Sequence, residues 1–320
     1  MLEPRSSLID ADGIQLHYLE WDAEQLIQTQ TSTFELPLQD DAIPLVMLHG
    51  LGATADTWRL VAEHLYQRRI VVAFDMRGHG QSDQPASGYD LVTIAEDIVH
   101  AMAALGFGKV ALVGHGWGGR VALVLAARHP ALVSHLILVD SLFVEPRHWP
   151  GMVRKRFINE QVPPRWFTSR TAYLEAMRNE MCTFWSPQVQ CIVLTYIREL
   201  PDGRVEEHLH ADIQRRIRTS LWEDRALSYY SKVTCPVLLV PAATEPKSGE
   251  ELPERLERAE DFASAKGHMA LQVSRIIRRC SVLWMPATSH EIQLQRPALL
   301  AQAIARFVAV SDECGLKGID

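Results

Sequence analysis

The stretch that decides the fold is Val113-Gly114-His115-Gly116-Trp117-Gly118-Gly119. It follows a short apolar run, Val110–Val113, and it opens a segment with helical character, Trp117–Arg128. A chain that passes sharply from a strand into a helix needs small residues on both sides of the turn. The pattern predicts a strand, a tight turn with Gly116 at its apex, and a helix.

Strand-like and helix-like segments alternate on both sides of this turn. They are Pro44–Leu48, Thr57–Arg68, Ile70–Phe74, Leu91–Leu105, Leu136–Val139, Pro236–Val240, Ser281–Met285 and Pro297–Val308. Such alternation is typical of parallel strands buried between two helical layers. Asp12-Gly13, within the alternating stretch Leu8–Tyr18, predicts an antiparallel hairpin before them. The expected fold class is α/β, a mostly parallel central sheet flanked by helices.

The alternation stops after Asp140, where an Arg-rich and aromatic segment begins. We predict an α/β core formed by residues 1–141 and 233–320, and an inserted helical lid formed by residues 142–232. Aromatic side chains of the lid, among them Trp149 and Trp185, are expected to make an apolar roof over the strand ends. Residues 22–41 are interpreted as a surface insertion. Residues 250–279 are expected to be a long helical insertion, at the site entrance or in a dimer contact.

The composition favours a protein that binds or acts on a small molecule rather than on nucleic acid or a membrane. The chain has 320 residues, 47% of them hydrophobic, a formal net charge of −7 and a pI of about 6.0. A basic surface for nucleic acid or for an anionic membrane is therefore not expected. The five cysteines lack metal-ligand spacing, and no metal site, nucleotide site or cofactor is expected. We expect a cytoplasmic protein, and the oligomeric state stays open.

Three further motifs lie in register with the glycine-rich turn. They are Leu48-His49-Gly50-Leu51-Gly52, the run Asp75-Met76-Arg77-Gly78-His79-Gly80-Gln81-Ser82-Asp83, and Ser289-His290 followed by Gln295-Arg296-Pro297. Together with the turn they resemble the α/β-hydrolase fold superfamily, in particular its lid-bearing epoxide hydrolase, C–C hydrolase and esterase-like branch. The resemblance implies that the turn is the G-x-Nu-x-G nucleophile elbow.

The resemblance also implies which residues form the site. His290 takes the place of the catalytic histidine, and the backbone N–H groups of Leu51 and Trp117 form an oxyanion hole. The acid that orients His290 is either Glu245, which aligns best, or Asp140, which ends a strand. His49, Gly50, Trp149 and Trp185 are expected to contribute to the substrate pocket. No metal ligand is implied.

The nucleophile position itself carries Gly116, which has no side chain to attack a substrate. Three hypotheses follow. In the first, His290 activates water or removes a substrate proton without a covalent intermediate, acting on a small and largely apolar molecule. In the second, the protein binds a small molecule without catalysis, as a receptor does. In the third, it is an esterase-like or epoxide-hydrolase-like enzyme that has been inactivated at this position.

Overall fold

The computed structural model describes residues 3–22, 42–160 and 166–314. Its centre is an eight-stranded sheet in the order β1-β2-β4-β3-β5-β6-β10-β11. The six strands from β4 to β11 in this order are parallel, and β1 and β2 pair antiparallel. Their bounds are β1 Arg5–Asp10, β2 Gln15–Trp21, β3 Leu45–Leu48, β4 Val71–Phe74, β5 Val110–His115, β6 Val133–Val139, β10 Val237–Val240 and β11 Cys280–Val282. The predicted α/β fold class is confirmed.

The predicted hairpin joins β1 to β2. Its turn residues, Asp12 and Gly13, both have positive φ, at 59° and 87°. Two consecutive positive φ angles match the right-handed twist of the flanking strands, and Asp-Gly is a preferred pair for such a turn. The surface insertion predicted for residues 22–41 lies almost wholly outside the described residues.

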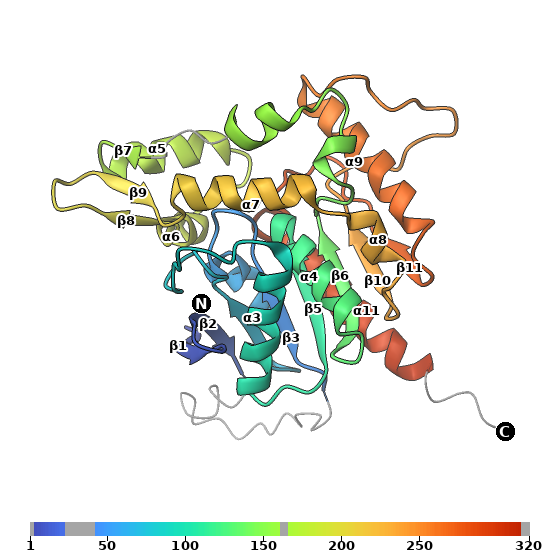
Figure 1. Cartoon of the computed structure of the whole chain (residues 1–320), viewed down its shortest axis with the longest axis horizontal. Coiled ribbons are helices and arrows are strands. Elements are labelled where there is room, and N and C mark those ends of the chain that lie inside the picture. The colour runs from blue at the N-terminus through green and yellow to red at the C-terminus, as the bar shows by residue number, and fades with distance from the viewer. Residues whose placement is uncertain (1–2, 23–41, 161–165, 315–320) are drawn as a thin grey trace.

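Helices cover both faces of the sheet, and the side-chain alternation of each strand decides which residues meet which layer. In β3, Leu45 and Met47 pack with one layer, which contains α2 Arg59–Ala62 and α11 Pro297–Cys314. Val46 and Leu48 pack with the other, which contains α3 Leu91–Ala104, α4 Gly116–Arg128 and α9 Ala259–Ser274. Figure 1 shows this second layer at the front, with α3 and α4 along the sheet.

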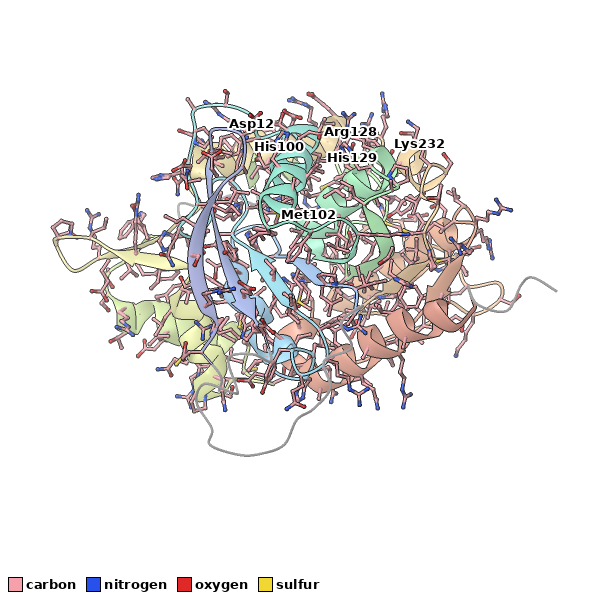
Figure 2. All side chains as sticks on the ribbon, turned by 90° about the horizontal axis from the view of Figure 1, so that it is seen from below. Asp12, His100, Met102, Arg128, His129 and Lys232 are labelled. Atoms are coloured by element: carbon pink, nitrogen blue, oxygen red, sulfur yellow. The ribbon has the colours of Figure 1, made fainter. Side chains whose placement is uncertain are left out.

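Helices α3 and α4 run side by side across this layer. Figure 2 labels His100 and Met102 on α3 beside Arg128 and His129 at the end of α4. Glu96 on α3 accepts a hydrogen bond from Arg128 and lies 3.0 Å from Nε2 of His129. These contacts fix the far end of the helix that begins at the glycine-rich turn.

The segment between β6 and β10 lies across the carboxyl ends of the strands (Figure 1). It contains η2 Pro146–His148, η3 Arg156–Glu160, α5 Arg170–Glu180, α6 Pro187–Leu194, α7 Ala211–Glu223, α8 Ala226–Tyr230, and a small sheet of β7 Trp166–Phe167, β9 Val205–Glu207 and β8 Ile197–Glu199. The predicted lid segment is largely helical, and it also contains a small sheet in which β8 and β9 form an antiparallel pair. The limits of a separate lid domain stay a prediction.

Two expectations need correction. The region 250–279 is helical only over α9, and its first part is an irregular loop. Thr57–Arg68 is not one helix, since η1 Ala55–Trp58 and the short α2 are followed by turns. A four-residue α10, Ile292–Gln295, precedes α11. Among the described residues no helix has both the length and the apolar character that crossing a bilayer requires.

A buried ion pair fastens the lid segment to the core. Arg120 on α4 pairs with Asp224 at the end of α7, and their side chains are 1% and 6% exposed. Arg120 also donates to the carbonyl of Leu142, and Arg147 donates to the carbonyls of Trp222 and Asp224. Breaking a buried pair leaves an uncompensated charge, which is far more costly than losing an exposed one.

Asp224→Ala is accordingly expected to lower the free energy of unfolding by about 3–5 kcal/mol, the usual cost of a broken buried pair. Urea denaturation followed by circular dichroism measures this loss. Asp212→Ala is the matched control, because Asp212 pairs with Arg215 on the exposed face of α7 and should cost less than about 1 kcal/mol. Equal losses in the two variants would contradict the proposed role of Arg120.

Candidate active site

The elbow is built by close packing of backbone around Gly116. Gly116 has φ +52°, a left-handed conformation that a residue with a side chain adopts only with strain. A Cβ at Gly114 would lie 2.5 Å from the carbonyl oxygen of Gly118, and one at Gly118 would lie 2.3 Å from that of His49. The glycines therefore allow β5 to turn into α4 directly against the loop that follows β3.

His290 and Asp140 form a hydrogen-bonded pair at the carboxyl ends of the strands. Nδ1 of His290 lies 2.6 Å from Oδ2 of Asp140. Asp140 directly follows β6, and His290 lies in the loop after β11. Glu245, which the sequence favoured as the acid, does not contact His290: its side chain is exposed in the loop after β10. That loop turns outward, whereas Asp140 sits at the strand end beneath the imidazole.

Asp140 is completely buried, and three donors compensate its charge. Oδ1 accepts the backbone N–H of Ala242 at 2.8 Å, and Oδ2 accepts both His290 and the ammonium group of Lys266, each at 2.6 Å. Burial alone would raise the pKa of Asp140, but Lys266 and His290 together hold this pKa well below its usual range. The residue is therefore a carboxylate throughout the physiological pH range.

The imidazole of His290 faces Gly116, the residue at the predicted nucleophile position. A Cβ built on Gly116 would lie 3.1 Å from Nε2 of His290. Because Nδ1–H donates to Asp140, the neutral ring carries its lone pair on Nε2. Desolvation lowers the pKa of His290, but the hydrogen bond and charge of Asp140 outweigh it and raise the pKa above its usual value. The ring is thus a base directed at Gly116.

Three buried histidines support the site as neutral structural groups. Burial lowers the pKa of His115 to about 4 and that of His79 to about 3, and it also lowers the pKa of His49. Nε2–H of His115 donates to the carbonyl of His290 at 3.0 Å, which fixes the backbone of that loop. His49 donates to the carbonyl of Gly50 and accepts the N–H of Met76.

The loop Asp75–Asp83 acts as a scaffold for these groups. Asp75 accepts the N–H groups of Ala55 and Gln81 and contacts Nδ1 of His17. The hydroxyl group of Ser82 donates to the carbonyl of Asp75. His79 stacks on the ring of Trp117, with centroids 5.0 Å apart. This loop therefore holds the layer beneath the elbow.

A cavity of about 290 Å³ lies over the elbow, and we call it the lid cavity. Its floor includes Leu51, Gly116, Trp117 and His290. The N–H of Trp117 belongs to the first turn of α4, where N–H groups have no partner inside the helix. The predicted oxyanion donors and the histidine thus border one space. His49 and Gly50 do not line it, in contrast to the prediction, because they lie underneath.

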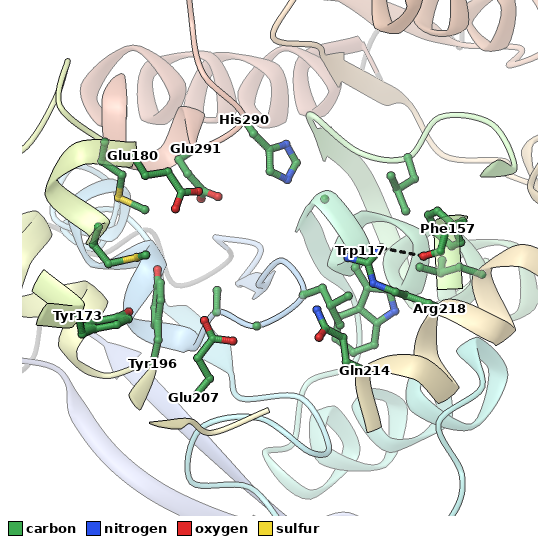
Figure 3. Close-up of a pocket in the computed structure, with 18 of the residues that line it drawn as sticks. Trp117, Phe157, Tyr173, Glu180, Tyr196, Glu207, Gln214, Arg218, His290 and Glu291 are labelled. Atoms are coloured by element: carbon green, nitrogen blue, oxygen red, sulfur yellow. Dashed lines mark hydrogen bonds between the residues drawn. The ribbon is translucent and has the colours of Figure 1, made fainter. Parts of the chain in front are cut away.

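The roof of the lid cavity is of mixed character. Figure 3 shows aromatic rings of Phe157, Tyr173 and Tyr196 together with charged side chains. The charged lining residues are Glu180, Glu207, Arg218 and Glu291. Trp149 also lines the cavity, as predicted, but Trp185 does not: it packs with the cluster around α5 and α6. The expected apolar roof is therefore only partly apolar.

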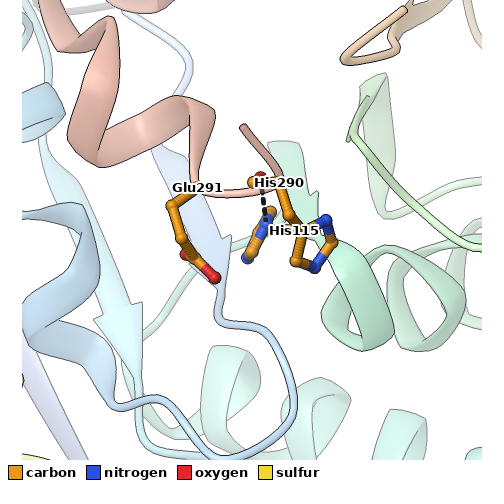
Figure 4. Close-up of side chains that lie close together, drawn as sticks. All are labelled: His115, His290 and Glu291. Carbon is orange, nitrogen blue, oxygen red and sulfur yellow. Dashed lines mark hydrogen bonds between the residues drawn. The ribbon is translucent and has the colours of Figure 1, made fainter. Parts of the chain in front are cut away.

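His115, His290 and Glu291 form a group of potential metal ligands, with their ligand atoms within 4.8 Å of one another (Figure 4). Each side chain, however, has another contact. Nδ1 of His290 is bound to Asp140, Nε2 of His115 to the carbonyl of His290, and Oε2 of Glu291 accepts the amide of Gln293 at 2.6 Å. These hydrogen bonds hold each of the three side chains in its place.

Comparison with known proteins relates part of this chain to a known family. The family model of the alpha/beta hydrolase fold matches residues 43–174, which hold the elbow and the loops after β3 and β4. Over 96% of this chain and 99% of the other, the crystal structure of E-2-(acetamidomethylene)succinate hydrolase superposes with a TM-score of 0.73, at 20% identity. The chain therefore has the α/β-hydrolase fold, and its residues 43–174 match the family model of that fold. The structural likeness, at this identity, shows the shared fold alone.

Curated relatives match over shorter stretches. The soluble epoxide hydrolase of a Corynebacterium species is 37% identical over 111 residues, 35% of this chain and 36% of the relative. The human (lyso)-N-acylphosphatidylethanolamine lipase is 33% identical over 135 residues, 41% of this chain and 37% of the relative. The matches span little more than a third of these relatives. They relate the chain to epoxide hydrolases and lipases without assigning it the activity of either.

Two residues near the His290–Asp140 pair were not identified from the sequence. Lys266 lies in the middle of α9, where a lysine with no motif around it indicates only a solvated helix face. The hydroxyl of Ser141 donates to the carbonyl of Gly116 at 3.1 Å. Its place directly after Asp140, at the carboxyl end of β6, was a usable signal, because parallel strands gather such residues at one edge.

The shared Oδ2 atom of Asp140 leads to a prediction about His290. Lys266→Met should raise the pKa of the imidazole, because a neighbouring positive charge disfavours imidazolium. Asp140→Asn should lower it, because the partner that favours imidazolium is removed. NMR titration of the His290 ring measures both shifts. Lys247→Met, on an exposed loop, is the control and should leave the titration unchanged. An unchanged or lowered pKa in Lys266→Met would refute this electrostatic account.

Proposed function

We propose that this protein is a hydrolase in which His290 activates water directly, without a covalent intermediate, on a small carbonyl compound such as an ester or lactone. The observation that carries the proposal is the His290–Asp140 pair, at 2.6 Å, with Nε2 directed at a nucleophile position that has no side chain. A protein that only binds a ligand has no use for an oriented, carboxylate-paired base.

The chemical step is balanced by groups that border the lid cavity. Nε2 of His290 takes a proton from water as the water oxygen bonds to the carbonyl carbon. The electron pair of the C=O bond moves onto oxygen, where the N–H groups of Leu51 and Trp117 stabilise the charge. When this intermediate collapses, the bond to the leaving group breaks, and the imidazolium returns its proton to that group. The products are an acid and an alcohol from an ester, and one hydroxy acid from a lactone.

The position of His290 also bears on the view that the protein is simply an inactivated enzyme. A side chain on Gly116 would place Cβ 3.1 Å from Nε2 and 3.3 Å from Cε1 of this ring, closer than ordinary contacts. His290 would have to move by a few tenths of an ångström to admit serine or aspartate. This geometry supports a site that is better matched to glycine than to serine or aspartate.

The test is an assay of the wild type and His290→Ala against activated esters and lactones. The wild type should release alcohol linearly, with no initial burst and no mass adduct, since no acyl-enzyme forms. His290→Ala should lower kcat/KM by about 10²–10⁴-fold, the usual contribution of a general base. The control, His100→Ala, alters an exposed histidine on α3 and should retain full activity.

One further variant, Gly116→Ser, separates the competing hypotheses. Gly116→Ser should not exceed the wild type, because its side chain crowds His290 and occupies the space for water. If the wild type is inert on every substrate while Gly116→Ser becomes active, the chain is a hydrolase that lacks only its nucleophile. If both are inert and the wild type binds the same compounds, the binding protein is the better description.

A further inference from the structure

A second cavity lies on the other side of His290, between α9 and the loops that follow β6, β10 and β11. Its volume is about 490 Å³, within the range of small-molecule pockets. We call it the α9 cavity, and its wall includes Leu142, Phe143, Leu256, Phe262, Ala263 and Met269. Leu256, Phe262, Ala263 and Met269 come from the 250–279 insertion, so this insertion shapes a pocket next to the site.

The α9 cavity and the lid cavity meet at the reacting centre. Leu142, Trp149 and His290 line both of them. The imidazole is 50% exposed although its partner Asp140 is fully buried. A molecule with its carbonyl group over Gly116 therefore has two directions in which its substituents can extend, one under the lid and one along α9.

The two cavities differ in charge. The lid cavity has Glu180, Glu207 and Glu291 against Arg218, a set with an excess of negative charge. In the α9 cavity the charged side chains besides His290 are Asp140 and Lys266, and these two pair with each other. Lys266 thus cancels the one carboxylate that would otherwise disfavour hydrocarbon there. Apolar groups gain more by entering the α9 cavity.

We propose that the α9 cavity binds the apolar arm of the substrate, so that the substrate class is a carbonyl compound with an unbranched hydrocarbon chain on one side. The polar side of the molecule lies in the lid cavity, whose carboxylates favour an uncharged or cationic group. The assignment rests on the proposed function for the position of the carbonyl group, but the cavity can be tested by binding alone.

The probe is a series of unbranched 2-alkanones from butanone to decanone, which carry the carbonyl group but no bond to hydrolyse. Isothermal titration calorimetry gives their dissociation constants. In the wild type each added methylene should tighten binding about fourfold, the value for burial of one CH₂ group, until the cavity is filled. A dissociation constant that does not vary with chain length would overturn the proposal.

Variants test which of the two cavities holds the alkyl chain of the ketone. Ala263→Phe and Leu256→Trp narrow the α9 cavity from two different segments. Each should abolish the increase in ketone affinity with alkyl chain length. Gln214→Trp narrows the lid cavity and should keep the dependence on chain length, as should the control Gln272→Phe on the exposed side of α9. The opposite result would refute the proposal. If affinity no longer increased with alkyl chain length in Gln214→Trp but still did so in Ala263→Phe and Leu256→Trp, the alkyl chain would lie in the lid cavity.

Turnover and ketone binding, both measured on the wild type, distinguish the two proposals. If the wild type shows no turnover but retains this pattern of ketone binding, the α9 cavity stands and only hydrolysis fails. If turnover is found and the binding pattern is absent, hydrolysis stands and the assignment of the apolar arm fails.

Discussion

The site depends on a carboxylate that has no access to water. Removing an ion from water costs several kcal/mol unless hydrogen bonds and opposite charge compensate it, and Asp140 is 0% exposed. Its partners come from three parts of the chain: the loop after β10, helix α9 and the loop after β11. The need to satisfy one buried group therefore brings these elements together, and the orientation of His290 follows from it.

The sheet and its elbow were predictable from sequence because they rest on local rules. Apolar β-branched runs between helical segments predict parallel strands, and the glycines around Gly116 predict a close backbone approach. The hairpin at Asp12-Gly13 was predictable for the same reason. The likeness of the chain to a well-known superfamily made the place of His290 an informed expectation rather than a guess.

What escaped prediction depends on long-range packing. The choice between Glu245 and Asp140 is decided by where the loop after β10 turns, which no local pattern encodes. Lys266 reaches Asp140 across 126 positions of sequence, and Trp185 packs within its own segment instead of facing the cavity. The strands β8 and β9, of three residues each, are too short to give a clear alternating pattern, so the sequence predicted the helices of this segment but not its small sheet.

The three histidines beneath the elbow have a consequence for the electrical behaviour of the protein. With pKa values of about 3 and about 4, His79 and His115 stay largely uncharged between about pH 5 and 8, the interval in which an ordinary imidazole titrates, and burial lowers the pKa of His49 as well. The charge of these two histidines beneath Gly116 thus responds little to acidity across that interval. A new reactive group installed above it would experience little change of charge from His79 and His115 in that interval, so that the titration of His290 could be followed against a steady background.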